Sequence, residues 1–221
     1  MVNYSENNVI TLAGKIVSER RFSHEVYGEG FYTFDLEIPR LSDNSDIIPV
    51  TVSERILNDE YQIGTKVKVE GQFRSYNNYE NEKNKLVLTV FVKDISIVTE
   101  EESETNPNEI VLNGFICKKP IYRTTPFGRE ISDILLAVNR AYNKSDYIPC
   151  IAWGRNARFC KNLSVGDNIK IWGRIQSRQY EKKFEDGTSE IRRAYEVSVC
   201  KMEVEKHENE IQINEAEEQK A

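Results

Sequence analysis

The sequence predicts an all-β protein made of two similar units in tandem, each with about five strands. Three observations support this fold class. Apolar and polar residues alternate along many short segments, which is typical of strands with one buried face. Turn-forming residues separate these segments, and related segments recur 100 residues apart. The repetition indicates a duplicated domain and not a solenoid, whose units need several stacked neighbours.

The repeat is clearest in three pairs of segments. They are "NVITLAGKIV" with "NEIVLNGFIC", "DIIPVTVSER" with "DYIPCIAWGR", and, after a two-residue insertion, "IGTKVKVEGQFRSY" with "VGDNIKIWGRIQSR". We therefore expect a diverged first domain over residues 1–98 and a second domain over residues 108–204. Residues 99–107 are acidic and without periodicity, and we expect an exposed linker there. Residues 205–221 are also acidic, and a disordered tail is expected.

Five strands are expected in the second domain, near residues 108–117, 131–140, 147–153, 168–177 and 193–202. Phe159 and Leu163 lie four residues apart and predict a short helix after the third strand, ended by Gly166. "EDGTSE" predicts a hairpin turn between the last two strands. Five strands with one helix after the third are the arrangement of the OB-fold, a small Greek-key barrel. We expect one such helix per domain; an SH3-like barrel, which lacks it, is the weaker alternative.

Two strands of the second domain carry aromatic and basic residues on one face. In "DYIPCIAWGR" Tyr147 and Trp153 share one face with Pro149 and Ile151, and the opposite face is formed by Ile148, Cys150 and Ala152. In "NIKIWGRIQSRQY" the face opposite the isoleucines carries Lys170, Trp172, Arg174, Gln176, Arg178 and Tyr180. Interleaved rings and cations suit single-stranded nucleic acid, because bases stack on rings while cations neutralise phosphates. Alternatively, the rings are core or interface residues and the cations form a solvated face.

The charge distribution favours a nucleic-acid partner for the second domain only. The whole chain has a net charge of −6, but residues 108–204 carry +6 and residues 8–98 carry −3. The remaining negative charge lies largely in the expected linker and tail. The local field at a binding surface matters for phosphate binding, so the negative total does not exclude nucleic acid.

Metal, catalytic and membrane functions find no support in the sequence. The four cysteines have no C-x-x-C spacing, and only His24 and His207 could add imidazole ligands, so we expect no metal site and no cofactor. A nucleophile–base pair, a carboxylate pair and a phosphate-binding loop are all missing, and we expect no enzyme. Without a run of 18 apolar residues or a secretory signal, a cytoplasmic protein with reduced thiols is expected.

The second domain resembles the bacterial single-stranded DNA-binding protein family (SSB). The resemblance rests on "NEIVLNGFICKKPIYRTTPFG", "ILLAVNR", "DYIPCIAWGRNARFCKNLSVGD" and "IKIWGRIQSRQY", with Gly-Arg-Ile-Gln-x-Arg as its most specific stretch. The first domain keeps "LAGKI", "DIIPV" and "VEGQFRSY". The resemblance implies an OB-fold that coats single-stranded DNA without strong sequence preference in replication, recombination and repair. It also implies a nucleoid-associated protein without catalytic activity.

The family resemblance assigns roles to several of these residues. Tyr147, Trp153 and Tyr180 fall on positions where family members stack bases, Arg178 falls on a basic position, and Arg123 matches a loop arginine. Trp172 stands where the family usually has an acidic residue, so it is either a DNA contact or an interface residue. The complete predicted set of DNA-binding residues is Tyr147, Trp153, Tyr180, Arg178, Arg174, Lys170, Arg140, Arg123 and Trp172.

Two departures from the family limit the resemblance. In the first domain Ile47 and Ser53 stand where the second has Tyr147 and Trp153, so we expect weak DNA binding there or a role in assembly. The chain ends in "NEAEEQKA", without the acidic Pro-Phe tip that recruits partner enzymes, which leaves replication and repair partners open. Since family members usually assemble four OB domains, two per chain imply a homodimer. The alternative function is a protein-interaction scaffold of the primosome-adaptor type, and RNA is the alternative ligand.

Overall fold

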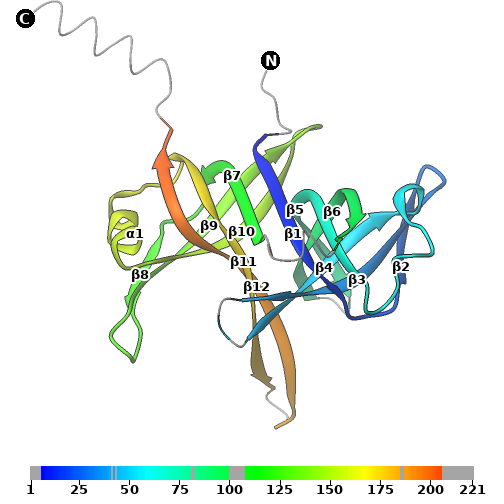
Figure 1. The fold of residues 1–221 in the computed structure, drawn as a ribbon. Coiled ribbons are helices and arrows are strands. Elements are labelled where there is room, and N and C mark those ends of the chain that lie inside the picture. The colour runs from blue at the N-terminus through cyan, green and yellow to red at the C-terminus, as the bar shows by residue number, and fades with distance from the viewer. Residues whose placement is uncertain are drawn as a thin grey trace, which may run out of the picture.

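The computed structural model describes residues 6–40, 42, 44–80, 83–99, 108–184 and 187–205, with 78–80 and 83–85 described by their backbone alone. Most of the expected linker and nearly all of the expected tail lie outside these residues. Two strand-rich units stand side by side, the first in blue to cyan and the second in green to orange (Figure 1). Among the described residues, no helix is long and apolar enough to cross a membrane.

Most of the described residues of both units lie in strands. The first unit contains β1 (Asn8–Ile16), β2 (Arg21–Val26), β3 (Glu29–Pro39), β4 (Ser45–Ser53), the 3₁₀ turn η1 (Glu54–Ile56), β5 (Lys66–Glu80) and β6 (Lys83–Ile97). The second contains β7 (Asn108–Ile116), β8 (Ile121–Thr124), β9 (Glu130–Arg140), β10 (Lys144–Trp153), α1 (Gly154–Phe159), the 3₁₀ turn η2 (Cys160–Asn162), β11 (Asn168–Lys183) and β12 (Ser189–Val204).

Each unit closes into a ring of five strands. In the first, the order is β1–β5–β6–β4–β3 and back to β1; in the second it is β7–β11–β12–β10–β9 and back to β7. In each ring one pairing is parallel, β4 with β6 and β10 with β12. The short strands β2 and β8 extend the ring as outer hairpin strands. This is the OB-fold arrangement, and the predicted all-β class is confirmed.

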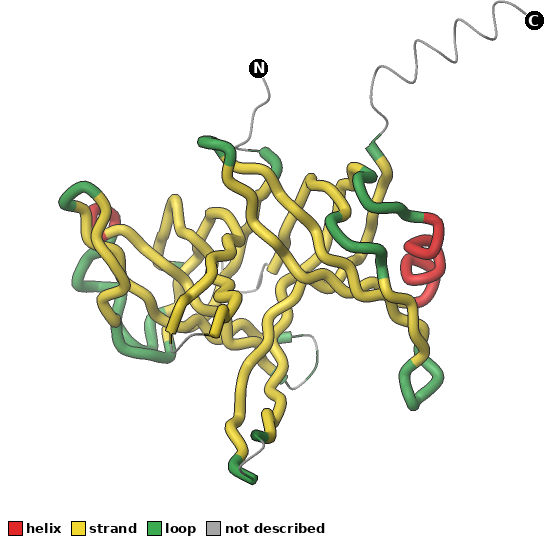
Figure 2. Tube along the Cα trace, turned by 180° about the vertical axis from the view of Figure 1, so that it is seen from behind, coloured by secondary structure: helices red, strands yellow, loops and turns green. Residues whose placement is uncertain are grey.

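The alternation of apolar residues correctly identifies the barrel interior. Ile169, Ile171 and Ile175 of β11 are fully buried, as are Ile148 and Ala152 of β10. The corresponding positions of the first unit are also fully buried and hold Val67, Val69, Phe73, Ile48 and Val52. The sequence did not indicate the strand β8 or the full length of the β11–β12 hairpin, which runs on to Lys183 and Ser189 and projects beyond the barrel (Figure 2).

The expectation of one short helix per domain is wrong for the first unit. After β10 the chain forms α1 and then η2, and both end before Gly166. After β4 it forms only the three-residue turn η1. The physical reason is length, because the first unit has two residues fewer between these strands. In the second unit Ala157 of α1 is buried, and Arg158 is 3.0 Å from Glu130 at the start of β9.

The two units share one continuous sheet, which the sequence did not predict. β1 pairs antiparallel with β7 over five residues, from Asn8 opposite Leu112 to Leu12 opposite Asn108. Within its own ring β1 contacts β3 only at Lys15 and Ile16. The first half of β1 therefore has an edge open to β7, and the same holds for β7 relative to β9. Pairing removes two exposed edges at once.

Equivalent bulges bend the longest strands of the two barrels. The register shifts at Gly71 in the first unit and at Gly173 in the second. At Gly173 an added Cβ would overlap the carbonyl oxygen of Ser198, and at Gly71 that of Phe91. A side chain at either position requires a backbone shift across the β-bulge.

We predict that Gly173→Ala lowers the free energy of unfolding by about 1–3 kcal/mol, because it overpacks a backbone contact. Chemical denaturation measures this. The control is Gly30→Ala, whose Cβ would meet the flexible Glu54 carboxylate at 2.6 Å; it should change stability by about 0.5 kcal/mol or less. Equal stability of the wild type and Gly173→Ala would contradict the prediction.

Candidate nucleic-acid interface

Strand β10 displays two aromatic rings on the outside of the second barrel. Ile148, Cys150 and Ala152 point inward and are buried. Tyr147 and Trp153 belong to the opposite face and are 47% and 37% exposed. They are therefore not core residues, although the sequence left that alternative open. A ring that exposes this much surface on a rigid strand can stack on a planar ligand.

Arg123 lies on the same face as Trp153, two strands away. In the register of the sheet Trp153 is opposite Ile131, and Ile131 is opposite Arg123. Residues directly opposite one another share a face, so the three side chains form a row across β10, β9 and β8. Arg123 is held by Asp133, with Nε 2.8 Å from a carboxylate oxygen, and this hydrogen bond raises the pKa of Arg123. A phosphate bound here would compete with the Asp133 carboxylate for the Arg123 guanidinium.

Arg178 and Tyr180 occupy the outer part of β11, where the hairpin leaves the barrel. The Arg178 side chain is 61% exposed and its guanidinium lies 5.8 Å from the centre of the Tyr180 ring. Glu196 on β12 is 4.0 Å from Arg178, a long contact that leaves the guanidinium accessible. Arg192 lies opposite Tyr180 on β12, and its guanidinium is paired with Glu190 at 2.7 Å.

The structure places Arg140 and Arg174 in ion pairs at the junction of the units. Arg140 is 3.1 Å from Asp146, and Arg174 is 3.6 Å from Asp46 of the first unit. Both carboxylates are fully buried. Burial raises the pKa of Asp146, while the Ser75 amide and the neighbouring arginines act in the opposite direction. Breaking such a pair leaves a buried charge uncompensated, so these arginines are held by the fold.

Arg74 of the first unit completes this charged junction. Its guanidinium lies 3.7 Å from the centre of the Phe91 ring and donates to Gln72. Burial, together with the positive charge of Arg140, lowers the pKa of Arg74 to about 10. The group is still protonated at neutral pH. No pattern in the sequence indicated that Arg74 and Arg140, 66 positions apart, would lie close enough to interact.

Lys170 and Trp172 lie on a different part of the surface. They belong to the first half of β11, where Trp172 is opposite Val111 of β7 and Lys201 of β12. Lys201 and Lys170 lie 4.4 and 5.2 Å from the centre of the indole ring. β10 is not a neighbour of this region, since β12 stands between them in the ring. The structure therefore does not bring Trp172 together with Tyr147 and Trp153.

In the turns of the second unit, the sequence analysis missed two exposed rings. Tyr142, in the turn between β9 and β10, is 95% exposed and has a φ of 61°. Phe127, in the turn between β8 and β9, is 92% exposed. The available signal was an aromatic residue inside a turn, in "AYNK" and "TPFG". Strand periodicity, which selected the other rings, gives no information in turns.

The corresponding face of the first unit is built differently. Ser53, at the position of Trp153, donates a hydrogen bond to Glu29, which also pairs with Arg55 at 3.0 Å. His24 stacks on Phe31 with ring centres 5.0 Å apart. Phe31 is buried, so this stack covers the barrel and presents mainly the imidazole. A polar network thus replaces the exposed indole.

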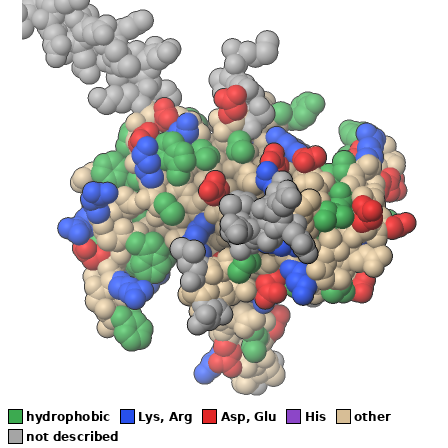
Figure 3. Space-filling model, viewed as in Figure 1, with side chains coloured by type: hydrophobic (Ala, Val, Ile, Leu, Met, Phe, Trp, Pro, Cys, Tyr) green, Lys and Arg blue, Asp and Glu red, His purple; other side chains and the backbone are tan. Residues whose placement is uncertain are grey.

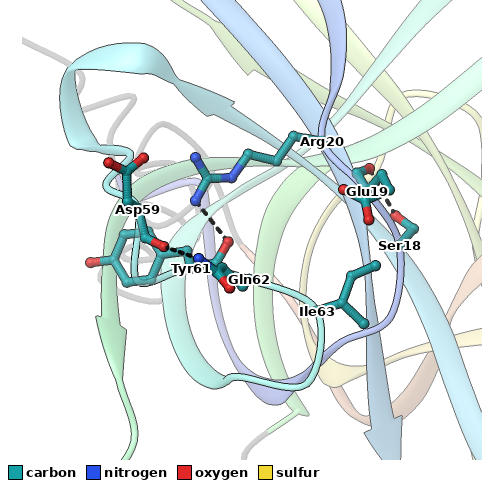
Figure 4. A pocket seen from close by; sticks show the side chains of 7 residues that line it. All are labelled: Ser18, Glu19, Arg20, Asp59, Tyr61, Gln62 and Ile63. Carbon is teal, nitrogen blue, oxygen red and sulfur yellow. Dashed lines mark hydrogen bonds between the residues drawn. The ribbon is translucent and has the colours of Figure 1, made fainter.

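A cavity of about 390 Å³ lies elsewhere in the first unit, between the β1–β2 and η1–β5 connections (Figure 4). Its lining residues are Ser18, Glu19, Arg20, Asp59, Tyr61, Gln62 and Ile63. Arg20 reaches across it and donates to the carbonyl oxygens of Asn58 and Tyr61. The Arg20 guanidinium therefore links the β1–β2 connection to the η1–β5 connection. The carboxylates of Glu19 and Asp59 also line the cavity and disfavour an anionic ligand there.

The visible surface reflects the uneven charge of the two halves. In Figure 3, Lys and Arg side chains gather on the second unit at the left, whereas Asp and Glu are frequent on the first unit at the right. Within the described residues no group of three or more His, Cys, Asp or Glu side chains is placed to hold a metal ion.

A five-stranded OB barrel with exposed rings and cations on one outer face defines a nucleic-acid-binding class of domain. Comparison with known proteins specifies the family. Residues 107–205 match the Single-strand binding protein family. This match spans nearly the whole second unit and slightly less than half of the chain.

Individual relatives agree with this assignment. A single-stranded DNA-binding protein of Clostridium tetani is 41% identical over 88 residues, which are 37% of this chain and 59% of that protein. The chain thus spans a little over half the length of this curated relative. The wild-type single-stranded DNA binding protein from Thermus aquaticus superimposes with a TM-score of 0.73 over 90% of this chain and 93% of that chain. At 18% identity this likeness shows the fold of both units.

A further solved structure is similar in sequence over one half. The N-terminal domain of PriB protein from Thermoanaerobacter tencongensis is 51% identical, and the match covers 43% of this chain and all of that one. The TM-score is 0.37, too low to compare the two folds.

Proposed function

We propose that the protein binds and coats single-stranded DNA without strong sequence preference, through its second unit. The observation that carries the proposal is the pair of exposed rings, Tyr147 and Trp153, on one strand of a domain of the single-strand binding protein family. Bases stack on the rings, which any base can do, so the binding is tolerant of sequence. The proposed setting is DNA replication, recombination and repair in the cytoplasm, at the nucleoid.

The proposed path of the strand runs over β10 and along the β11–β12 hairpin. Trp153 and Tyr147 stack bases, and Tyr180 stacks another beside Arg178. Arg123, in a row with Trp153, meets a phosphate in competition with Asp133. We assign Arg140 and Arg174 to holding the units together, because buried carboxylates bind them. No catalytic step and no cofactor are part of this function.

We expect Tyr147→Ala and Trp153→Ala each to weaken binding of oligo-dT by about 1–3 kcal/mol, the contribution of one base stack. Fluorescence anisotropy of labelled oligo-dT measures the affinity, and quenching of the two tryptophans provides an independent signal. Ile47→Ala and Ser53→Ala, at the equivalent positions of the first unit, are matched controls and should retain wild-type affinity. Folded protein that does not bind oligo-dT at low salt would refute the proposal and favour a protein-interaction scaffold. Binding of a matched duplex as tightly as oligo-dT would refute single-strand preference.

Arg178→Ala should mainly reduce the salt dependence of DNA binding, because this residue is proposed to contact a phosphate and not to stack on a base. The expected result is a slope of log K against log salt that is smaller by about 0.7, the value for one phosphate contact on a single strand. Titrations at several salt concentrations measure the slope. Arg55→Ala, an exposed arginine of the first unit, is the control and should leave the slope unchanged. An unchanged slope for Arg178→Ala would exclude a phosphate contact at this residue.

We further propose a homodimer that brings four OB units together. The supporting observation is the outer face of the joined sheet, where exposed Val9 lies opposite Val111 and half-buried Trp172 lies beside Val111. Light scattering during gel filtration should give the mass of two chains. Trp172→Glu should shift this mass toward one chain, whereas Trp153→Ala should not. A wild-type mass of one chain at micromolar concentration would rule the homodimer out.

A further inference from the structure

The junction of the two units contains the same hydrogen-bonded clasp twice. In the first clasp, Asp46 of β4 accepts a hydrogen bond from the Ser177 amide of β11 at 2.6 Å. The Ser177 Oγ in turn accepts from the amide of Ile47 at 3.1 Å. Arg40 supports the carboxylate at 2.8 Å. A side chain of each unit thus binds the backbone of the other.

The second clasp repeats this arrangement with the roles of the units exchanged. Asp146 of β10 accepts from the Ser75 amide of β5 at 2.7 Å. The Ser75 Oγ accepts from the amide of Tyr147, also at 2.7 Å. Arg140 supports the carboxylate. The serine and both carboxylates are buried, so water does not readily replace these bonds.

The two clasps differ in what they hold. Ser177 binds the backbone of Ile47, which lacks a ring. Ser75 binds the backbone of Tyr147, one of the two exposed rings of β10. Along β10 the pairing with β12 is found only at Cys150 and Ile151. Tyr147 therefore pairs with Ala137 of β9 on one side, and on its other side Ser75 takes the place that β12 occupies farther along β10.

We propose that Ser75 of the first unit is a positioning residue for DNA binding by the second unit. By fixing the Tyr147 backbone it holds the ring on the face that also carries Trp153. The ring is then ordered before DNA arrives, which removes an entropic cost from binding. This inference rests on the proposed function, and it gives the first unit a part in DNA binding without requiring that it touch DNA.

The test is a double-mutant cycle in the full chain, read out by anisotropy of labelled oligo-dT. Ser75→Ala should weaken binding about three- to tenfold, the range expected for one hydrogen bond. In a Tyr147→Ala background the same change should have no further effect, because the ring that Ser75 positions is gone. A general structural defect would weaken binding equally in both backgrounds.

Ser177→Ala is the matched control, since it removes the equivalent hydroxyl from the clasp that holds Ile47. Any effect it has should be the same with and without Tyr147. Ser75→Thr, which keeps the hydroxyl, should bind oligo-dT like the wild type. This variant still tests the proposal if Ser75→Ala does not fold. Thermal unfolding followed by circular dichroism establishes that each variant is folded.

The outcomes separate this inference from the proposed function. If the wild type binds oligo-dT and Tyr147→Ala weakens it, but Ser75→Ala has no effect or an effect independent of Tyr147, the positioning role is overturned and the DNA-binding function stands. If the folded wild type does not bind oligo-dT, the proposed function itself fails.

Discussion

The antiparallel pairing of β1 with β7 is the contact on which the rest of the structure depends. Each barrel closes its ring at one end of its first strand, at Lys15 and Ile16 or at Phe115 and Ile116, and leaves the other end with an open edge. Open edges invite pairing with any available strand. Here the two edges satisfy each other through five residue pairs. This brings β4 and β5 of one unit close to β11 and β10 of the other, where the clasps form.

The clasps show that the junction was kept while the outer faces diverged. Asp46 and Asp146 occupy equivalent positions, as do Ser75 and Ser177, and their hydrogen bonds match within a few tenths of an ångström. On the outer faces, by contrast, Ser53 and its polar network stand where the second unit exposes Trp153. Buried bonds tolerate little change because losing one partner leaves the other unsatisfied. Exposed positions carry no such penalty.

The sequence predicted what local periodicity controls. Alternation placed Ile169, Ile171 and Ile175 inside the barrel and Tyr147 and Trp153 outside, because a strand has two faces. The same rule placed Arg174 and Arg178 together, although one pairs with buried Asp46 and the other is exposed. Periodicity gives the face of a residue but not its partner across the sheet. The β1–β7 pairing, the clasps and the ion pair of Arg174 with Asp46 all join distant segments, and local patterns contain no information on them.

Because many charged side chains are paired, the net charge of the second unit is a poor measure of the positive charge available on its binding face. The second unit has a net charge of +6, yet Asp133, Asp146 and Glu196 lie among its arginines. Arg140 is bound by a buried carboxylate and contributes to the fold, whereas Arg178 has only a 4.0 Å contact and keeps most of its charge available. A phosphate must displace Asp133 to gain Arg123 fully. Among these residues the positive charge is therefore most available at Arg178, beside Tyr180 on the hairpin, because Arg192 is paired with Glu190 at 2.7 Å. On the proposed function, binding by this face divides into a salt-sensitive part at Arg178 on β11 and a salt-insensitive part, base stacking, at the rings of β10.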